Sequence, residues 1–323
     1  MSADLAIAAS DLVKTYPGDV RAVRGVSLAV PAGTVFGLLG PNGAGKSTTV
    51  KILTTLTKAT SGTAVVAGHD VDRQPDAVRR SIGCVFQKHA VDPEATGREN
   101  LLLQGHLYGL RGAALRARAG ELLDRFGLAD AAGRLTRTWS GGMQRKLDVA
   151  MGLVHRPSVL FLDEPTTGLD PEARADLWAE IGRLARDEGL TVLLTTHYLE
   201  EADRLADQLV IVDRGRVVAA GTAEQLKSEL RGDALVVELG TAPAVPPVLP
   251  GVREVTLDGR TLRARVDDGA RAVPAVLAAL DAAGLVPASV TVARPSLDDV
   301  YLRHTGRAFA DGTATPELEG ATR

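Results

Sequence analysis

The sequence has little of what disulfide-bonded, nucleic-acid-coating or membrane-spanning proteins require. Its single cysteine, Cys84, forms no internal disulfide and is too few for a cysteine-rich metal site. Lys and Arg number 37 against 40 Asp and Glu, so the net charge is −3 and the chain lacks the basic excess of a protein that coats nucleic acid. An uncharged run at residues 25–45 contains two prolines and six glycines, which exclude one continuous membrane-spanning helix.

The length and composition predict a globular protein of about two domains. Hydrophobic residues make up 45% of the chain and charged residues 24%, as is usual for a globular protein. We expect the first domain at residues 1–230 and, because four prolines crowd residues 242–251, an extended linker at 231–251. Strand patterns around an Ala-rich helix predict a small α+β domain at 252–306, and the polar tail 307–323 is expected to be disordered.

Short apolar runs alternate with helical patterns in the first domain. Runs at residues 34–39, 82–86, 159–162 and 191–194 predict buried strands, and helices are expected from residue 46 and over 171–187. Strands that alternate with helices indicate an α/β fold with a largely parallel sheet. A mostly helical stretch at 97–154 interrupts this alternation. It predicts an inserted helical subdomain.

A glycine-rich loop follows the first of these strands and precedes a helix. Its pattern is that of a phosphate-binding loop, in which backbone N–H groups converge on an anion at a helix N-terminus. Lys46 can then reach the β- and γ-phosphates, and the Ser47 hydroxyl can bind Mg²⁺. The alternative is a glycine turn that happens to precede a lysine. The nucleotide-binding residues predicted here are Gly40, Pro41, Asn42, Gly43, Ala44, Gly45, Lys46, Ser47 and Thr48.

Two carboxylates end the apolar strand at residues 159–162. A buried parallel strand places Asp163 and Glu164 at its carboxyl edge, where ligands of open α/β sheets bind. Successive strand residues point to opposite sides, so the two acids take different roles. We expect Asp163 to bind Mg²⁺ and Glu164 to orient or deprotonate the attacking water. The alternative is a strand that simply ends in solvated acids.

A second possible anion site precedes this strand. Ser140, Gly141 and Gly142 begin a helix, where N–H groups and a hydroxyl suit a phosphate, although such a sequence is more often only a helix cap. Together with the loop and the acids, the segment Trp139-Ser140-Gly141-Gly142-Met143-Gln144 resembles the signature of ATP-binding cassette (ABC) ATPases. The resemblance implies a P-loop ABC ATPase fold and catalytic roles for Lys46, Glu164 and His197. It also implies that Gln87 contacts Mg²⁺ and nucleotide, Asp170 lies in the family's D-loop, and Tyr16 stacks on adenine.

Residues 96–101, Met143 and residues 295–302 resemble the daunorubicin-resistance branch of these ATP-binding subunits. The resemblance implies ATP and Mg²⁺ as cofactors and a homodimer that clamps two ATP molecules. It further implies a separate transmembrane permease as partner, no nucleic-acid partner, and a peripheral position at the cytoplasmic face of the cell membrane. The function it implies is that of an ATP-hydrolysing subunit that energises export of drugs or antibiotics.

Other functions compete with this one. A soluble ABC ATPase of translation resembles two cassettes in tandem, whereas this chain has one phosphate loop. A DNA-repair type resembles a cassette split by a long coiled coil, and this sequence shows none. An importer subunit stays open, since only the resemblance at residues 295–302 favours export. An unrelated P-loop kinase or GTPase is disfavoured by Ser140 to Gly142. The C-terminal module has no catalytic cluster in its sequence and is interpreted as an interaction or regulatory domain.

Overall fold

The computed structural model describes residues 4–230, 232–243, 245–247 and 249–306. The chain divides into two compact units, an N-terminal unit up to Thr222 and a C-terminal unit from Ala223. Each unit has its own sheet and its own core. We describe them separately.

A six-stranded sheet forms the centre of the N-terminal unit, in the order β10-β9-β3-β8-β7-β6. Neighbouring strands run parallel except for β10, which pairs antiparallel with β9. Every residue of β3, β7 and β8 is buried, which is why these strands read as continuous apolar runs. The four predicted strands are thereby confirmed. The bounds are β3 Val35–Leu39, β6 Ile82–Val85, β7 Val159–Asp163, β8 Thr191–Thr196, β9 Gln208–Asp213 and β10 Arg216–Gly221.

A second, antiparallel sheet precedes and flanks the first, in the order β2-β1-β4-β5. Its strands are β1 Leu5–Tyr16, β2 Val20–Pro31, β4 Ser61–Val66 and β5 His69–Asp70. Val23, Val26, Leu28 and Val30 of β2 are buried between exposed neighbours, the alternation of a sheet with one face on a core. We made no prediction for this sheet. Its inward side chains share one apolar cluster with Phe36 and other residues of the parallel sheet.

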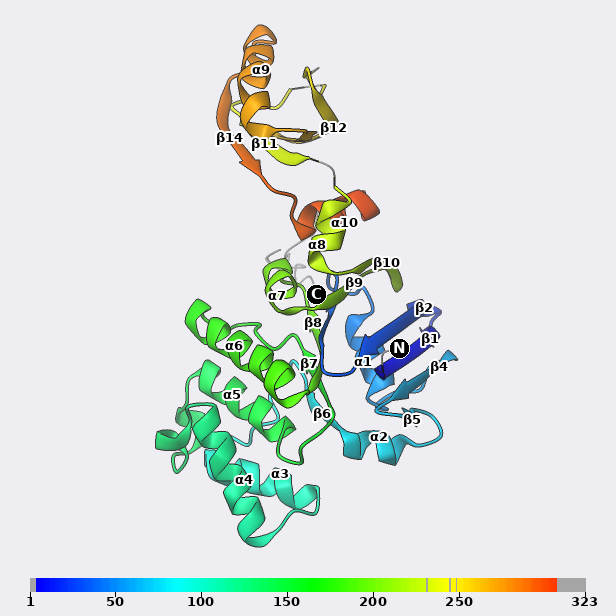
Figure 1. Ribbon diagram of the computed structural model, residues 1–323, viewed down its shortest axis with the longest axis vertical. Coiled ribbons are helices and arrows are strands. Elements are labelled where there is room, and N and C mark those ends of the chain that lie inside the picture. Colours follow the sequence, from blue (N-terminus) through cyan, green and yellow to red (C-terminus); the bar gives the residue numbers. More distant parts are fainter. Residues whose placement is uncertain (1–3, 231, 244, 248, 307–323) are drawn as a thin grey trace, which may run out of the picture. The chain divides into compact units, whose positions relative to one another are not determined.

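Helices account for the rest of the N-terminal unit, and the expected helical insertion is present. The insertion consists of α3, α4 and α5, which Figure 1 shows gathered in one lobe, away from β1, β2 and β4. A capping box begins α3, in which Thr96 and Glu99 bind each other's backbone N–H groups. The helices are α1 Lys46–Leu53, α2 Pro75–Ser81, α3 Gly97–Leu107, α4 Gly112–Arg125, α5 Gly141–Gly152, α6 Pro171–Glu188 and α7 Leu199–Leu205.

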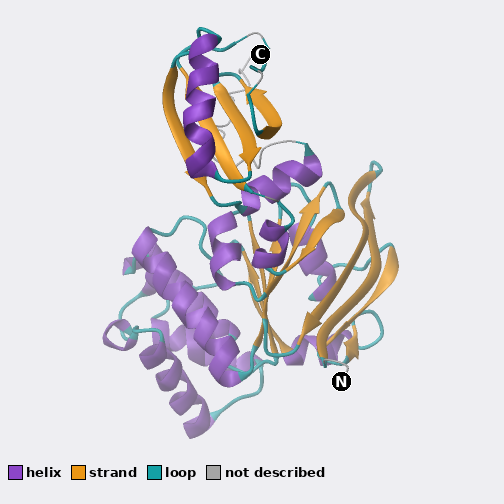
Figure 2. Cartoon of the chain, turned by 45° about the horizontal axis from the view of Figure 1, so that its top comes forward, coloured by secondary structure: helices purple, strands orange, loops and turns teal. Residues whose placement is uncertain are grey.

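The C-terminal unit is a four-stranded antiparallel sheet with helices. The strand order is β12-β13-β11-β14, and α9 lies along one face of the sheet (Figure 2). Leu235, Leu262, Val276 and Leu280 form the centre of its core. The elements are α8 Ala223–Ser228, β11 Asp233–Leu239, β12 Val252–Asp258, β13 Thr261–Val266, α9 Gly269–Ala282, β14 Pro287–Ala293 and α10 Leu297–Thr305.

The boundaries of this unit differ from our expectation in two respects. The unit begins at Ala223, inside the residues 1–230 that were expected to form the first domain. The segment 231–251, expected as an extended linker, contains β11, which pairs with both β13 and β14. The prolines occur only after β11 ends. They therefore indicate an extended chain in the second half of the segment and give no information about the first half. The expected tail at 307–323 lies outside the described residues.

Within the part of the chain that the structure describes, no helix combines the length and the apolar character needed to cross a bilayer.

Candidate nucleotide-hydrolysis site

The loop between β3 and α1 is shaped by glycines that no other residue could replace without rearrangement. Gly45, which precedes α1, has φ +103°, and a Cβ there would lie 2.4 Å from the Ala22 carbonyl oxygen. A Cβ on Gly40 would lie 2.3 Å from the Val212 carbonyl oxygen. The loop therefore packs against β2 and β9 by backbone alone. A glycine loop that opens a helix in this way can offer backbone N–H groups to an anion.

Lys46 is a buried cation at this loop, with only 4% of its surface exposed. Its Nζ donates to the carbonyl oxygens of Gly40 at 2.6 Å and Pro41 at 3.2 Å, and it lies 3.5 Å from Glu164 Oε1. Burial lowers the pKa of Lys46, while the charges of Glu164 and Asp163 act in the opposite direction. An anionic phosphate at the loop would stabilise the charged amine further.

Asp163 ends β7 as expected, and its carboxylate meets a hydroxyl from each of two neighbouring elements. Ser47 Oγ lies 3.2 Å from Asp163 Oδ1, and Thr195 Oγ1 of β8 donates to the same oxygen. A serine hydroxyl and a carboxylate are the oxygen donors that Mg²⁺ prefers. No cluster of three or more His, Cys, Asp or Glu capable of holding a metal occurs among the described residues. The pair fits an ion whose other ligands are water and phosphate oxygens.

Glu164, the residue after Asp163, has a strained backbone conformation with φ +51°. Its N–H donates to the carbonyl oxygen and to the hydroxyl of Thr195, both at 3.1 Å. Its carboxylate lies between Lys46 and His197, whose Nδ1 is 3.2 Å from Oε2. The interaction with His197, supported by Lys46 and opposed by burial, holds the pKa of Glu164 below its usual range. The group is therefore a carboxylate at neutral pH, as a water-orienting residue requires.

One pocket of about 520 Å³ brings most of the predicted residues together. Tyr16 enters it from the end of β1, and Gln87 enters it just after β6. Val20, Arg21 and Ala22 of β2 also line it, although no sequence motif marked them. The remaining lining residues are Pro41, Asn42, Gly43, Ala44, Gly45, Lys46, Ser47, Thr48 and Glu164.

Ser140, Gly141, Gly142 and Asp170 do not line this pocket. Ser140 caps α5, and its Oγ accepts from the N–H of Met143 at 3.2 Å. Asp170 caps α6, and its Oδ1 accepts from the N–H of the third residue on at 2.9 Å. Both are exposed. Within one chain they act as helix caps, which leaves the tip of α5 free to face another molecule.

Two residues of this site carried no signal strong enough for us to name them. Thr195 binds Asp163 and Glu164 at once, yet a threonine within a buried β-strand is unremarkable in sequence. Arg145 of α5 is 3% exposed and bonded to backbone around Glu164. A charged residue on the buried face of an otherwise apolar helical pattern was the available clue.

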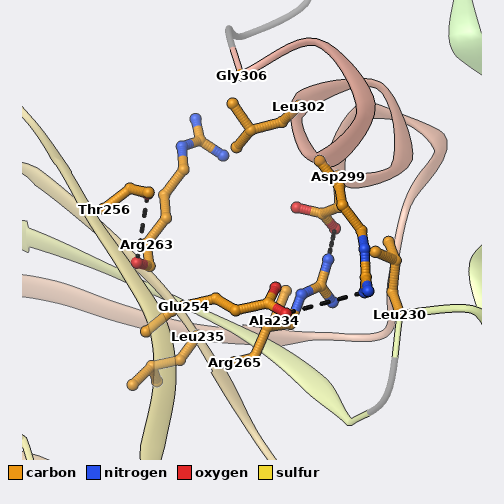
Figure 3. A pocket seen from close by; sticks show the side chains of 12 residues that line it. Leu230, Ala234, Leu235, Glu254, Thr256, Arg263, Arg265, Asp299, Leu302 and Gly306 are labelled. Carbon is orange, nitrogen blue, oxygen red and sulfur yellow. Dashed lines mark hydrogen bonds and ion pairs between the residues drawn. The ribbon is translucent and has the colours of Figure 1, made fainter. Parts of the chain in front are cut away.

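The C-terminal unit has a cavity of about 160 Å³ that differs in kind from the nucleotide pocket. Figure 3 shows the Arg265 guanidinium beside Asp299, and their atoms Nη2 and Oδ2 are 3.2 Å apart. Asp299 also accepts from the backbone N–H and the hydroxyl of Ser296, in the capping box that begins α10. Arg303, on the same helix, lies 3.8 Å from Glu254. These charges join α10 to the sheet of this unit.

Comparison with known proteins identifies the family of the chain. A family model described as ABC transporter matches residues 23–167. One described as "ATP-binding protein DrrA1-3-like, C-terminal domain" matches residues 221–305. The daunorubicin resistance ATP-binding protein DrrA3 of Streptomyces coeruleorubidus is 50% identical over 310 residues, which cover 94% of this chain and 97% of that protein. The chain belongs to the daunorubicin-resistance branch of the ABC transporter ATP-binding proteins.

Other members of this family and solved cassettes extend the likeness. The daunorubicin/doxorubicin resistance ATP-binding protein DrrA of Streptomyces peucetius is 49% identical over 97% of this chain and 96% of its own length. A dimeric ATP-binding cassette solved in a post-hydrolysis state with ADP and phosphate matches with a TM-score of 0.61 and 28% identity, over 67% of this chain and 98% of that one. The ADP conformation of an ABC-transporter cassette matches with a TM-score of 0.63 and 26% identity, over 69% and 92%.

Family membership and this geometry identify the chain as an ATP hydrolase with a nucleotide-binding P-loop ABC ATPase unit and a small α+β C-terminal unit.

Proposed function

We propose that this chain energises the export of drug-like or antibiotic molecules through a separate membrane permease. The observation that carries the proposal is a pocket lined by Lys46, Ser47 and Glu164, with Asp163 bonded to Ser47 and His197 beside Glu164. The relatives at 49–50% identity, which match along nearly their whole length, are named for drug resistance. A linearmycin resistance ATP-binding protein of Bacillus subtilis, 34% identical over 94% of this chain and 99% of its own length, extends this theme to another antibiotic.

The roles of the pocket residues follow from the charge that ATP hydrolysis develops. Lys46, buried beside the loop, meets negative charge on the phosphates. Ser47 and Asp163 would hold Mg²⁺, which supplies charge neutralisation at the phosphate oxygens when bound. Glu164 orients the attacking water, and His197 beside it assists in stabilising the developing charge.

The adenine and the sensor positions have separate assignments. Tyr16, at the rim of the pocket, is assigned to stack on adenine. Gln87, at the end of β6, is assigned to contact Mg²⁺ or the attacking water and to transmit closure to the permease. Backbone amides of the loop bind the phosphates.

A homodimer accounts for the residues that lie outside the pocket. Ser140, Gly141 and Gly142 form a helix N-terminus, which favours an anion, and its first turn contains no acidic residue. We assign this tip, with Asp170, to the nucleotide bound by a second copy. ATP shared between two copies then holds them together, and hydrolysis lets them separate. The permease would hold the dimer at the cytoplasmic face of the membrane.

Transport by inverted membrane vesicles tests this function. Vesicles that contain the chain and the permease encoded with it should accumulate doxorubicin when Mg²⁺ and ATP are added outside. Glu164→Gln should abolish accumulation. Glu172→Gln, which changes an exposed acid on α6, should not. ATP-dependent loss of drug from the same vesicles would indicate an importer, and no ATP-dependent movement would contradict the proposal.

A further inference from the structure

Arg145 of α5 binds the backbone of two segments of the site, the one that carries Gln87 and the one that carries Glu164. Its Nε donates to the Pro165 carbonyl oxygen and its Nη1 to the Phe86 carbonyl oxygen, both at 2.7 Å. Its Nη2 lies 3.3 Å from the carbonyl oxygens of Asp163 and Glu164. The side chain is buried, and α5 packs beside β6 (Figure 1). The N–H groups of the guanidinium therefore find backbone carbonyl oxygens as acceptors, at and just after the ends of β6 and β7.

The bond to the Glu164 carbonyl bears directly on the water-orienting carboxylate. A φ of +51° in a residue with a side chain costs about 1–3 kcal/mol and persists only when its surroundings impose it. Thr195 of β8 binds the N–H of Glu164, and Arg145 binds its carbonyl oxygen. Both peptide groups of the strained residue are thus fixed from outside. The carboxylate then lies where Lys46 and His197 meet it.

A second set of contacts fixes the segment that contains Gln87. Asp148, one turn after Arg145 on α5, is 3.3 Å from its Nη1 and is itself 4% exposed. Asp148 Oδ1 accepts from the Ala90 N–H at 3.2 Å, while Arg145 binds the carbonyl of Phe86. The two ends of residues 86–90 are therefore attached to α5. Gln87, which lines the nucleotide pocket, lies between them.

We propose that Arg145 is a positioning residue for ATP hydrolysis, which keeps the Glu164 carboxylate and the Gln87 segment in a fixed relation to α5. The inference rests on the proposed function, because α5 begins with the Ser140 tip assigned to the second copy's nucleotide. A helix rises about 1.5 Å per residue, so this tip is only about 7 Å along the axis from Arg145. A shift of the tip therefore reaches the water-orienting carboxylate. Lysine cannot substitute, since one ammonium nitrogen does not reach acceptors spread around a planar guanidinium.

Turnover per bound nucleotide tests the proposal without being affected by partly unfolded protein. Arg145→Lys and Arg145→Gln should each lower kcat about 100-fold, the effect expected of an ångström-scale misplacement, while the affinity for Mg-ATP stays unchanged. Lys146→Met is the matched control. Lys146 is the next residue of α5, pairs with Asp176 at the surface, and has no bond to the site. It should match the parent in both measurements.

A double-mutant cycle separates positioning from a general structural effect. If Arg145 acts through the Glu164 carboxylate, adding Arg145→Lys to Glu164→Gln should leave the residual single-turnover rate unchanged. Additive losses would overturn the inference.

The outcomes also distinguish this inference from the proposed function. If the parent chain with its permease shows no Mg-dependent hydrolysis or export, the function fails. If the parent hydrolyses ATP and both Arg145 variants turn over at the parent's rate, only the positioning role fails.

Discussion

The two units bury charge for different purposes. In the N-terminal unit, Lys46, Arg145, Asp163 and His197 are each at most 8% exposed, and they meet at the carboxyl ends of β6, β7 and β8. In the C-terminal unit, Arg265 is 7% exposed and pairs with Asp299 beside a helix cap. Lys46 of the first arrangement lines a pocket of about 520 Å³, and both residues of the second line one of about 160 Å³.

This difference teaches how to separate functional from structural buried charge. In the N-terminal unit, Lys46 and the strained Glu164 line one open pocket, and Asp163 and His197 contact residues that line it. The charges of the C-terminal unit join one helix, α10, to the sheet beside it. Convergence on a volume able to hold a ligand favours chemistry, whereas pairing between packed elements favours stability. The predictions below test that distinction.

The largest expected effect is on turnover in the N-terminal unit. Glu164→Gln keeps the size of the side chain but removes the carboxylate, so ATP hydrolysis should fall about 10²–10⁴-fold, the range for a lost general base. Nucleotide binding should be retained, because Lys46 and the loop amides are intact. Steady-state ATPase assays with equilibrium binding of a fluorescent ATP measure both. Parent-like hydrolysis by this variant would remove the role assigned to Glu164.

The corresponding change in the C-terminal unit should affect stability alone. Asp299→Ala leaves the buried Arg265 without its partner, at a cost of about 3–5 kcal/mol. Both tryptophans, Trp139 and Trp178, lie in the N-terminal unit. Urea unfolding should therefore show an earlier transition by circular dichroism and an unchanged one by tryptophan fluorescence. Asp281→Ala, at an exposed position of α9, is the control, and a lost affinity for ATP would contradict the separation of the units.

A matched pair of helix caps sharpens the comparison. Ser140 and Ser296 each accept an N–H from the third residue on, so alanine at either should cost about 1 kcal/mol of stability. Only Ser140→Ala should also reduce cooperative ATP hydrolysis, since its hydroxyl is assigned to the second copy's phosphate. Equal ATPase activity in the two variants would mean that Ser140 is a cap and nothing more.

The smallest effect concerns a buried acid that does no chemistry in this account. Glu201 of α7 accepts from Trp178 Nε1 at 2.8 Å and Thr166 Oγ1 at 3.0 Å, and burial raises its pKa. A raised pKa means that the folded state favours the protonated acid. The stabilisation of the folded state by Glu201 is complete below the pKa of this group in the unfolded chain. It is lost as the pH rises toward the pKa of the group in the folded protein.

Glu201→Gln, which mimics the protonated form, should remove this dependence. The free energy of unfolding of the parent relative to the variant should fall steadily as pH rises from about 4, near the unfolded pKa of glutamate. Chemical denaturation at several pH values measures it. A parallel pH dependence in the two proteins would show that Glu201 does not titrate with folding.

Much of the fold could be predicted from the sequence because its strongest signals are local. The runs that became β3, β7 and β8 are mostly apolar since both faces of each strand are covered. The sheet of β1, β2, β4 and β5 has alternating burial and weaker patterns, and no prediction was made for it. β11 was assigned to a linker because prolines nearby dominated its segment, while its pairing with β13 and β14 is non-local.

The sequence by itself determined the chemistry that this chain contains: a glycine loop with Lys46, an acidic pair after an apolar strand, and a serine-led helix start. These depend on residue type and spacing, which neighbours along the chain decide. Only the tertiary structure decided that Thr195 and Arg145 bind the backbone around Glu164, and that the Ser140 tip lies outside its own chain's pocket. Such contacts join residues far apart in sequence, so they exist only once the strands and helices have packed.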